Sequence, residues 1–121
     1  LSTGGKFVNK AIKYSDEAGS LVKNVPDKVD EVLEYVNKHN GSPPPNYKGG
    51  KVFDNIDKST GKNVLPKADA SGNAITYKEY DVNPKPAPGS GQTRGTERIV
   101  QGSDGSTYYT NDHYDTFEKI K

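Results

Sequence analysis

Histidine and cysteine content limits the chemistry open to this chain. Its 121 residues contain two histidines, His39 and His113, and no cysteine. A cysteine nucleophile, a disulfide and a thiolate metal site are therefore excluded. A histidine metal site would have to borrow carboxylates, and no HExxH motif or similar spacing is present. We expect neither a metal nor a cofactor.

Two glycine-rich stretches could suggest phosphate binding: Gly89-Ser90-Gly91 and Gly102-Ser103-Asp104-Gly105. Neither ends in the Gly-Lys-Ser/Thr sequence of a phosphate loop, which argues against nucleotide hydrolysis. Acid and base catalysis by side chains is the chemistry that remains.

Four segments of the chain resemble the guanyl-specific microbial ribonucleases of the barnase type. They are residues 51–55 with Leu65-Pro66 downstream, residues 77–81, residues 93–99 and residues 108–117. They occur in the order of the family, and the Asp-His-Tyr-x-Thr-Phe core of the last segment is the most specific. The resemblance spans about residues 25–121, which we interpret as the ribonuclease domain. Residues 1–24 are interpreted as a leader or tether that could hold a short helix.

The resemblance implies a role for four residues. Glu79 matches the general base, His113 the general acid, and Arg94 and Arg98 the arginines that bind phosphate. Cleavage of single-stranded RNA needs a carboxylate to take the proton of the ribose 2′-hydroxyl and an imidazolium to protonate the departing 5′-oxygen. Planar guanidinium groups suit the charge that builds on the phosphoryl oxygens. The chain is thus expected to be a metal-independent endoribonuclease that leaves a 2′,3′-cyclic phosphate.

Each of these residues also has a simpler interpretation. One by one they could be a solvated strand carboxylate, two arginines in surface ion pairs with Asp81 and Glu97, and a histidine in a turn. All four would then have to match the family's spacing by chance, so we favour the functional interpretation. Asp81 is expected to orient the arginines rather than contact substrate. His39 is interpreted as a helix-end residue, because the helix dipole favours an imidazolium there.

Base recognition is predicted in the loop that begins at Phe53. The family pattern Phe-x-Asn-Arg-Glu offers backbone amides and a carboxylate to guanine. Here Asn55 is retained, Ile56 replaces the arginine, and Asp57 is one methylene shorter than glutamate. We predict a preference for guanine, with substrate-binding residues Phe53, Asn55, Asp57, Tyr114 and Lys51.

Periodic patterns predict the elements that position these residues. Apolar residues at helical spacing predict a helix over residues 26–40, with Pro26 in its first turn and Gly41 at the C′ position; they are Val29, Val32, Leu33 and Val36. Strands are expected at residues 51–53, 74–82, 97–101 and 106–110. A wide loop rich in proline and glycine precedes Arg94, and Asp104-Gly105 suits a tight hairpin turn. The predicted fold class is α+β, with the helix on one face of a twisted antiparallel sheet.

Composition adds little about partners. The formal net charge is +1, so any cationic site must be local. No apolar run approaches the ~18 residues of a membrane span, and we expect a protein with no membrane contact that is a monomer when free. The resemblance implies single-stranded RNA as substrate and an acidic cognate inhibitor or immunity protein, because enzymes of this family kill the producing cell unless inhibited.

Three hypotheses about biological role stay open. The absence of methionine, even at position 1, suggests the C-terminal toxin domain of a bacterial toxin delivered into a target-cell cytoplasm, or a free secreted nuclease. A second hypothesis restricts cleavage to one structured RNA such as a transfer RNA. The third is a non-catalytic module that binds RNA or protein, against which the retained acid and base argue.

Overall fold

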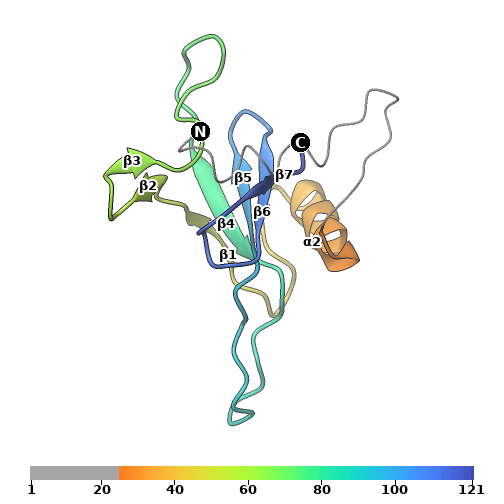
Figure 1. Ribbon diagram of the computed structural model, residues 1–121. Helices are drawn as coiled ribbons and strands as arrows, with labels where there is room; N and C mark the ends of the chain where they lie inside the picture. The colour runs from red at the N-terminus through yellow and green to blue at the C-terminus, as the bar shows by residue number, and fades with distance from the viewer. Residues whose placement is uncertain (1–24) are drawn as a thin grey trace.

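The structure is a computed structural model, and it describes residues 25–121. One helix, α2 (Asp27–Lys38), is followed by seven strands in this part of the chain. The strands are β1 (Gly49–Val52), β2 (Ile56–Asp57), β3 (Lys62–Asn63), β4 (Tyr77–Asp81), β5 (Arg98–Gly102), β6 (Thr107–Thr110) and β7 (Glu118–Lys119). Figure 1 shows α2 lying across one face of the sheet, which confirms the predicted α+β class. The leader predicted for residues 1–24 lies outside the described residues.

Helix α2 begins and ends close to the predicted positions. Pro26 is the N-cap in an extended conformation (φ −63°, ψ 150°), so the helix begins one residue later than predicted. At the other end, the Gly41 amide donates to the Val36 carbonyl at 2.9 Å. Asn40, with φ 55°, takes the left-handed C′ position that was predicted for Gly41. His39 is the C-cap, and its ring stacks on Tyr35 with 3.7 Å between centroids, as suits a helix-end residue.

The strands form two antiparallel sheets. Five strands pair in the order β1-β4-β5-β6-β7, and β2 pairs with β3 in a separate hairpin. Strands β1, β4, β5 and β6 were predicted from the sequence, but β2, β3 and β7, each of only two residues, were not. Strand β4 is also shorter than the predicted 74–82, because Ala74 pairs only in an isolated bridge with Ala68.

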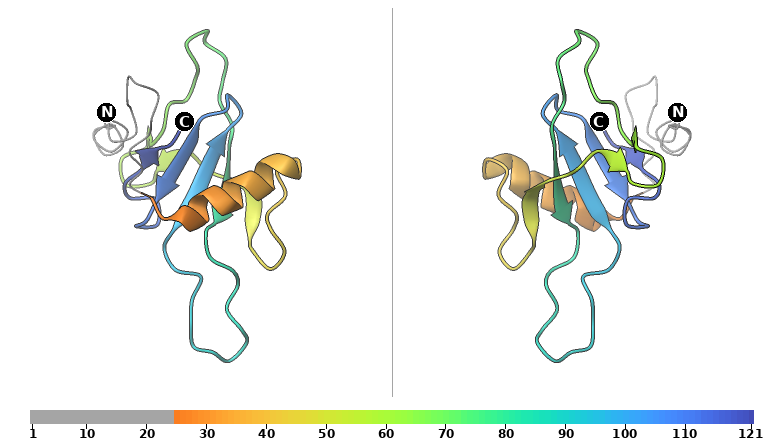
Figure 2. Two further views of the ribbon diagram at one scale, coloured as in Figure 1. Left: turned by 90° about the vertical axis from the view of Figure 1, so that its right-hand side faces the viewer. Right: turned by 90° about the vertical axis from the view of Figure 1, so that its left-hand side faces the viewer.

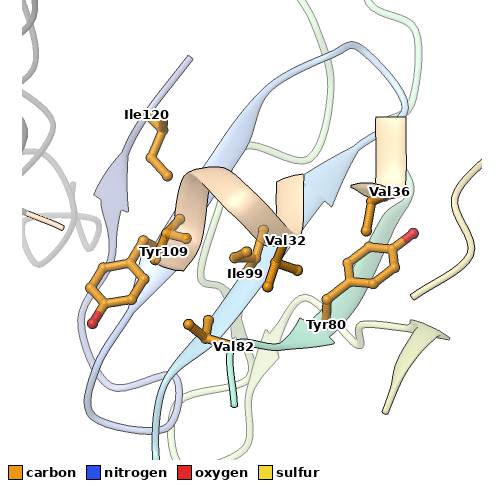
Figure 3. Close-up of a cluster of buried hydrophobic side chains, with 8 residues drawn as sticks. Val32, Val36, Tyr80, Val82, Ile99, Tyr109 and Ile120 are labelled. Carbon is orange, nitrogen blue, oxygen red and sulfur yellow. The ribbon is translucent and has the colours of Figure 1, made fainter. Parts of the chain in front are cut away.

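Each face of the large sheet carries its own apolar cluster. The cluster under α2 is drawn in Figure 3 and joins the buried face of the helix to Tyr80, Val82, Ile99, Tyr109 and Ile120. The cluster on the opposite face contains Phe53, Leu65, Tyr77, Val100, Tyr108 and Phe117. Because side chains alternate along a strand, β4 sends Tyr80 toward the helix and its odd-numbered residues toward the opposite face.

Two connections between strands have the predicted character. The β5–β6 hairpin turns over residues 103–105, where the Gly105 amide donates to the Gly102 carbonyl at 3.0 Å. Gly105 has φ +88°, which glycine adopts at little cost and which this turn requires. The β4–β5 connection, residues 82–97, extends from the sheet as a long arm (Figures 1 and 2). Among residues 25–121, no helix has the length and apolar character needed to cross a bilayer.

Candidate active site

The face of the sheet opposite α2 carries the predicted general base and the carboxylate beside it. Glu79 and Asp81 are two residues apart on β4 and therefore point to the same side. In the strand register Glu79 lies opposite Val100, and Asp81 lies opposite Arg98. The sheet thus places Glu79, the predicted base, and Arg98, a predicted phosphate-binding arginine, on the same face in neighbouring cross-strand pairs.

Asp81 holds both arginines, as predicted. Its Oδ1 lies 3.1 Å from Arg98 Nε, and its Oδ2 accepts a hydrogen bond of 2.7 Å from Arg94. The Arg98 side chain is 5% exposed and also donates to the carbonyls of Gly95 and Glu97, whereas the Arg94 side chain is 36% exposed. We call Asp81, Arg94 and Arg98 the clamp. Its geometry leaves Arg94 as the more accessible of the two guanidinium groups.

His113 lies in a loop whose backbone is unusual. His113 has φ 54° and the next residue, Tyr114, has φ 77°, a conformation that residues with a side chain adopt at a cost. The loop is braced by Asp112, whose carboxylate accepts from the Thr116 amide at 2.8 Å and from the Thr116 hydroxyl at 2.5 Å. The His113 amide donates to the Thr96 carbonyl at 3.1 Å. These contacts hold the backbone of the loop that presents the exposed imidazole.

No role was predicted from the sequence for Asp112, Thr116 or Thr96. The signal was nevertheless present, because Asp112 and Thr116 are two of the residues that make the Asp-His-Tyr-x-Thr-Phe core specific. A short polar side chain that bonds to a backbone amide a few residues along is a common way to stabilise a loop. The motif therefore contains both the predicted acid and contacts that stabilise the loop on which it lies.

Tyr114 connects the predicted base to the wall of the cleft. Its hydroxyl donates to Glu79 Oε1 at 2.6 Å, and its ring stacks on Phe53 with 5.2 Å between centroids. Burial raises the pKa of Tyr114, and the hydrogen bond to the Glu79 carboxylate raises it further. The phenol is therefore a donor at neutral pH, and it fixes one oxygen of the carboxylate.

A cleft of about 850 Å³ brings these groups together. Glu79, His113, Tyr114 and Phe53 line it along with residues of the β2–β3 hairpin. The hairpin residues are Ile56, Asp57, Lys62 and Asn63, with Lys58 and Thr60 from its turn. None of the three clamp residues is among the lining residues. The clamp lies beside the cleft, because Asp81 follows Glu79 by two residues on the same face of β4.

The remaining predicted substrate residues are placed in different ways. The Asn55 side chain does not line the cleft: its amide donates to the Leu65 carbonyl at 2.8 Å and its oxygen accepts from the Leu65 amide at 2.7 Å. Asp57 does line it, although its Oδ1 accepts from the amide and hydroxyl of Ser59 at 2.9 and 2.6 Å. Lys51 lies opposite Glu79 in the register of β1 and β4, outside the set of cleft-lining residues.

The described residues contain no cluster of side chains that could bind a metal ion. Across residues 25–121, no three or more histidine or carboxylate side chains form a group that could bind a metal ion.

Comparison with known proteins shows the family to which the chain belongs. Residues 10–121 match the family model for ribonuclease, a match that begins within the predicted leader. The chain is 34% identical over 94 residues to the guanyl-specific ribonuclease St of Saccharopolyspora erythraea, covering 78% of each protein. It resembles a crystal structure of ribonuclease Sa2 with guanosine-2′-cyclophosphate, with a TM-score of 0.51, 32% identity, and coverage of 81% of this chain and 88% of the other. A structure of ribonuclease Sa2 complexes with mononucleotides gives a TM-score of 0.51, 36% identity, and coverage of 80% and 85%. The chain therefore belongs to the microbial ribonuclease family that its sequence resembles, and it is an endoribonuclease.

Proposed function

We propose that this endoribonuclease cleaves single-stranded RNA after guanosine, without a metal, by transesterification to a 2′,3′-cyclic phosphate. The observation that carries the proposal is the shared cleft, which Glu79 and His113 both line. A carboxylate and an imidazole that border one cleft can act on the two oxygens exchanged at a single phosphodiester.

The reaction assigns one proton transfer to each residue. Glu79 takes the proton of the ribose 2′-hydroxyl as the bond between the 2′-oxygen and phosphorus forms. His113, as an imidazolium, gives a proton to the 5′-oxygen as the bond between phosphorus and that oxygen breaks. Arg94 and Arg98 stabilise the charge on the non-bridging oxygens, and Asp81 keeps the two guanidinium groups aligned before substrate arrives.

Guanine preference is proposed from the loop after Phe53 and from the relatives. Ribonuclease St is named as guanyl-specific, and one Sa2 structure holds a guanosine nucleotide. In this chain Asn55 braces the start of the loop, while Phe53 and Asp57 border the cleft. Tyr114 stacks beside Phe53 and offers an aromatic edge to a base. Lys51, next to Glu79 in the register, is retained as a candidate for contact with the phosphate.

Digestion of total RNA in excess chelator tests the proposal. Sequencing of the cut ends should show scattered cuts after guanosine, and the products should carry cyclic phosphates. Cuts at one dominant site would instead support restriction to a structured RNA. Loss of cutting in chelator with recovery on adding a divalent metal would contradict the metal-independent mechanism.

Substitution of the two proton-transfer residues tests their roles. Glu79→Ala and His113→Ala should each lose on the order of 10²-fold or more in rate, and the parent should show a bell-shaped dependence of rate on pH. His39→Ala is the matched control, since His39 is the C-cap of α2 and lies outside the cleft lining. Full activity in either active-site variant, with its circular dichroism unchanged, would show that the assigned role is wrong.

We further propose a bacterial toxin role with an acidic cognate inhibitor or immunity protein. The inhibitor would cover the exposed His113 and the partly exposed Arg94 with carboxylates, which would block the site and speed association. Expression of the active chain should arrest growth unless the inhibitor is supplied, and the size of the precursor in producing cells separates a large delivered toxin from a small secreted nuclease. Residues 25–121 remain our proposal for the catalytic domain, so a chain without residues 1–24 should keep its activity.

A further inference from the structure

A polar network lies on the helix side of the sheet, where the long arm leaves it. Glu97 immediately precedes β5, and its Oε1 accepts from Lys28 Nζ at 2.7 Å. Its Oε2 accepts from the Tyr109 hydroxyl at 2.6 Å. Asn83, at the opposite end of the arm, donates to Glu97 Oε1 at 3.2 Å and accepts from Lys28 at 2.8 Å. The network therefore joins α2, β6 and both ends of the arm, whose base lies near the first turn of α2 (Figure 2).

The same network reaches the backbone of the clamp. Asn83 Nδ2 also donates to the Arg94 carbonyl at 3.4 Å. A Cβ added at Gly95, which has φ +72°, would lie 3.2 Å from Asn83 Nδ2, so the amide closes tightly on this turn. The Glu97 carbonyl accepts from Arg98 at 2.7 Å. Glu97 thus belongs to the network through its side chain and contacts Arg98 of the clamp through its backbone carbonyl.

The charge state of Glu97 fits this arrangement. Burial raises the pKa of Glu97, but hydrogen bonds from Lys28, Tyr109 and Asn83 outweigh burial, and the net effect is a lowered pKa. The side chain is 20% exposed and is a carboxylate at neutral pH. A carboxylate with three donors is a rigid anchor, because each added hydrogen bond restricts its orientation.

We propose that Glu97 is a positioning residue for phosphate binding: acting through Asn83, it closes the base of the arm and sets Arg94 against Asp81. The inference rests on the proposed role of Arg94 in the reaction. Glu97 does not act on substrate itself, because its neighbour Arg98 points to the cleft side of the sheet and Glu97 contacts Lys28 and Tyr109 on the helix side. Closing a loop between residues 14 positions apart costs chain entropy, and the Glu97–Asn83 contact offsets that cost.

A double-mutant cycle tests the proposal on the full chain. Glu97→Gln should lower kcat/KM about tenfold in the parent, measured well below the unfolding temperature on a guanosine-containing dinucleotide. In an Arg94→Ala background the same change should cost less than about twofold, because the group that it positions is gone. Lys28→Arg, which keeps a cation beside the carboxylate, should retain activity. Glu34→Gln, in the exposed pair of Glu34 with Lys38, is the matched carboxylate control and should change nothing.

The outcomes separate this inference from the proposed function. If Glu97→Gln costs the same factor in both backgrounds, Glu97 is only structural and the inference is wrong. If Arg94→Ala itself keeps full activity, the proposed role of Arg94 fails and the inference fails with it. Where Glu97→Gln does not fold, Asn83→Ala removes the contact to the Arg94 carbonyl and should show the same coupling to Arg94.

Discussion

Replacing Asp81 by asparagine removes the negative charge that lies between two guanidinium groups. Arg98 is 5% exposed, so its charge would stay buried with two backbone carbonyls and an amide oxygen as acceptors. Loss of one partner from a buried ion pair costs roughly 3–5 kcal/mol, and the remaining acceptors place this case near 3 kcal/mol. The contact to Arg94, which is 36% exposed, adds less than about 1 kcal/mol because solvent screens it.

Urea unfolding measures this cost directly. The chain has 8 tyrosines and no tryptophan, so tyrosine fluorescence and far-ultraviolet circular dichroism can follow the transition together. With a denaturant slope of roughly 1–3 kcal/mol per molar, the midpoint for Asp81→Asn should fall by about 2 M. Cleavage should also slow by about tenfold or more under conditions where the variant is folded, because the guanidinium groups lose their alignment.

A matched substitution separates burial from charge. Glu34 is 71% exposed and pairs with Lys38 at 3.8 Å one helical turn away, so Glu34→Gln should change the free energy of unfolding by less than about 0.5 kcal/mol. If Asp81→Asn unfolds at the same urea concentration as Glu34→Gln, the buried charge of Arg98 does not need Asp81, and the stabilising role assigned to Asp81 is wrong.

Three further changes have expected outcomes. Tyr114→Phe keeps the ring but loses the hydrogen bond to Glu79, so kcat/KM for a dinucleotide should fall about tenfold; unchanged kinetics would mean that the contact does not orient the base. Asn55→Ala loses both hydrogen bonds to Leu65 and should unfold about 2 kcal/mol more easily in urea, with a raised KM for guanosine substrates, whereas an unaltered KM would separate the loop from base recognition. The pKa of Glu97 is lowered, so its carboxylate contributes stability above the unfolded-state pKa, and this contribution is lost as pH falls through the folded-state pKa. Thermal unfolding of the parent and Glu97→Gln should therefore converge toward acid pH, and a constant difference would contradict the assigned shift.

Sequence patterns predicted the parts of the fold that repeat over several residues. Helix α2 was predictable because its apolar residues recur every three or four positions, and β4, β5 and β6 because aromatic and β-branched residues are concentrated there. Strands β2, β3 and β7 contain two residues each, too few for any periodicity to show. The β2–β3 hairpin depends instead on pairing between Ile56–Asp57 and Lys62–Asn63.

The candidate site was predictable where a motif carried it and not where it depends on distant contacts. Glu79, His113 and the two arginines were named from segments that resemble the family in a fixed order, and Asp81 was expected to orient the arginines. The contact between Lys28 and Glu97 joins residues 69 positions apart, and no local pattern announces it. Asn55 was predicted to bind substrate, whereas in the structure its side-chain amide braces the backbone of Leu65, a contact that only the folded geometry reveals.

In the loop that presents His113, stability and the proposed catalytic role make opposite demands. His113 and Tyr114 both occupy the left-handed region where glycine is favoured, so the backbone there would be more relaxed without the two side chains to which we assign roles in the proposed reaction. Selection for stability alone would therefore favour glycine at these positions, and under the proposed mechanism the stabilised chain would lose its activity. Any route to a thermostable nuclease has to improve other regions, such as the exposed arm, and leave this loop in its costly conformation.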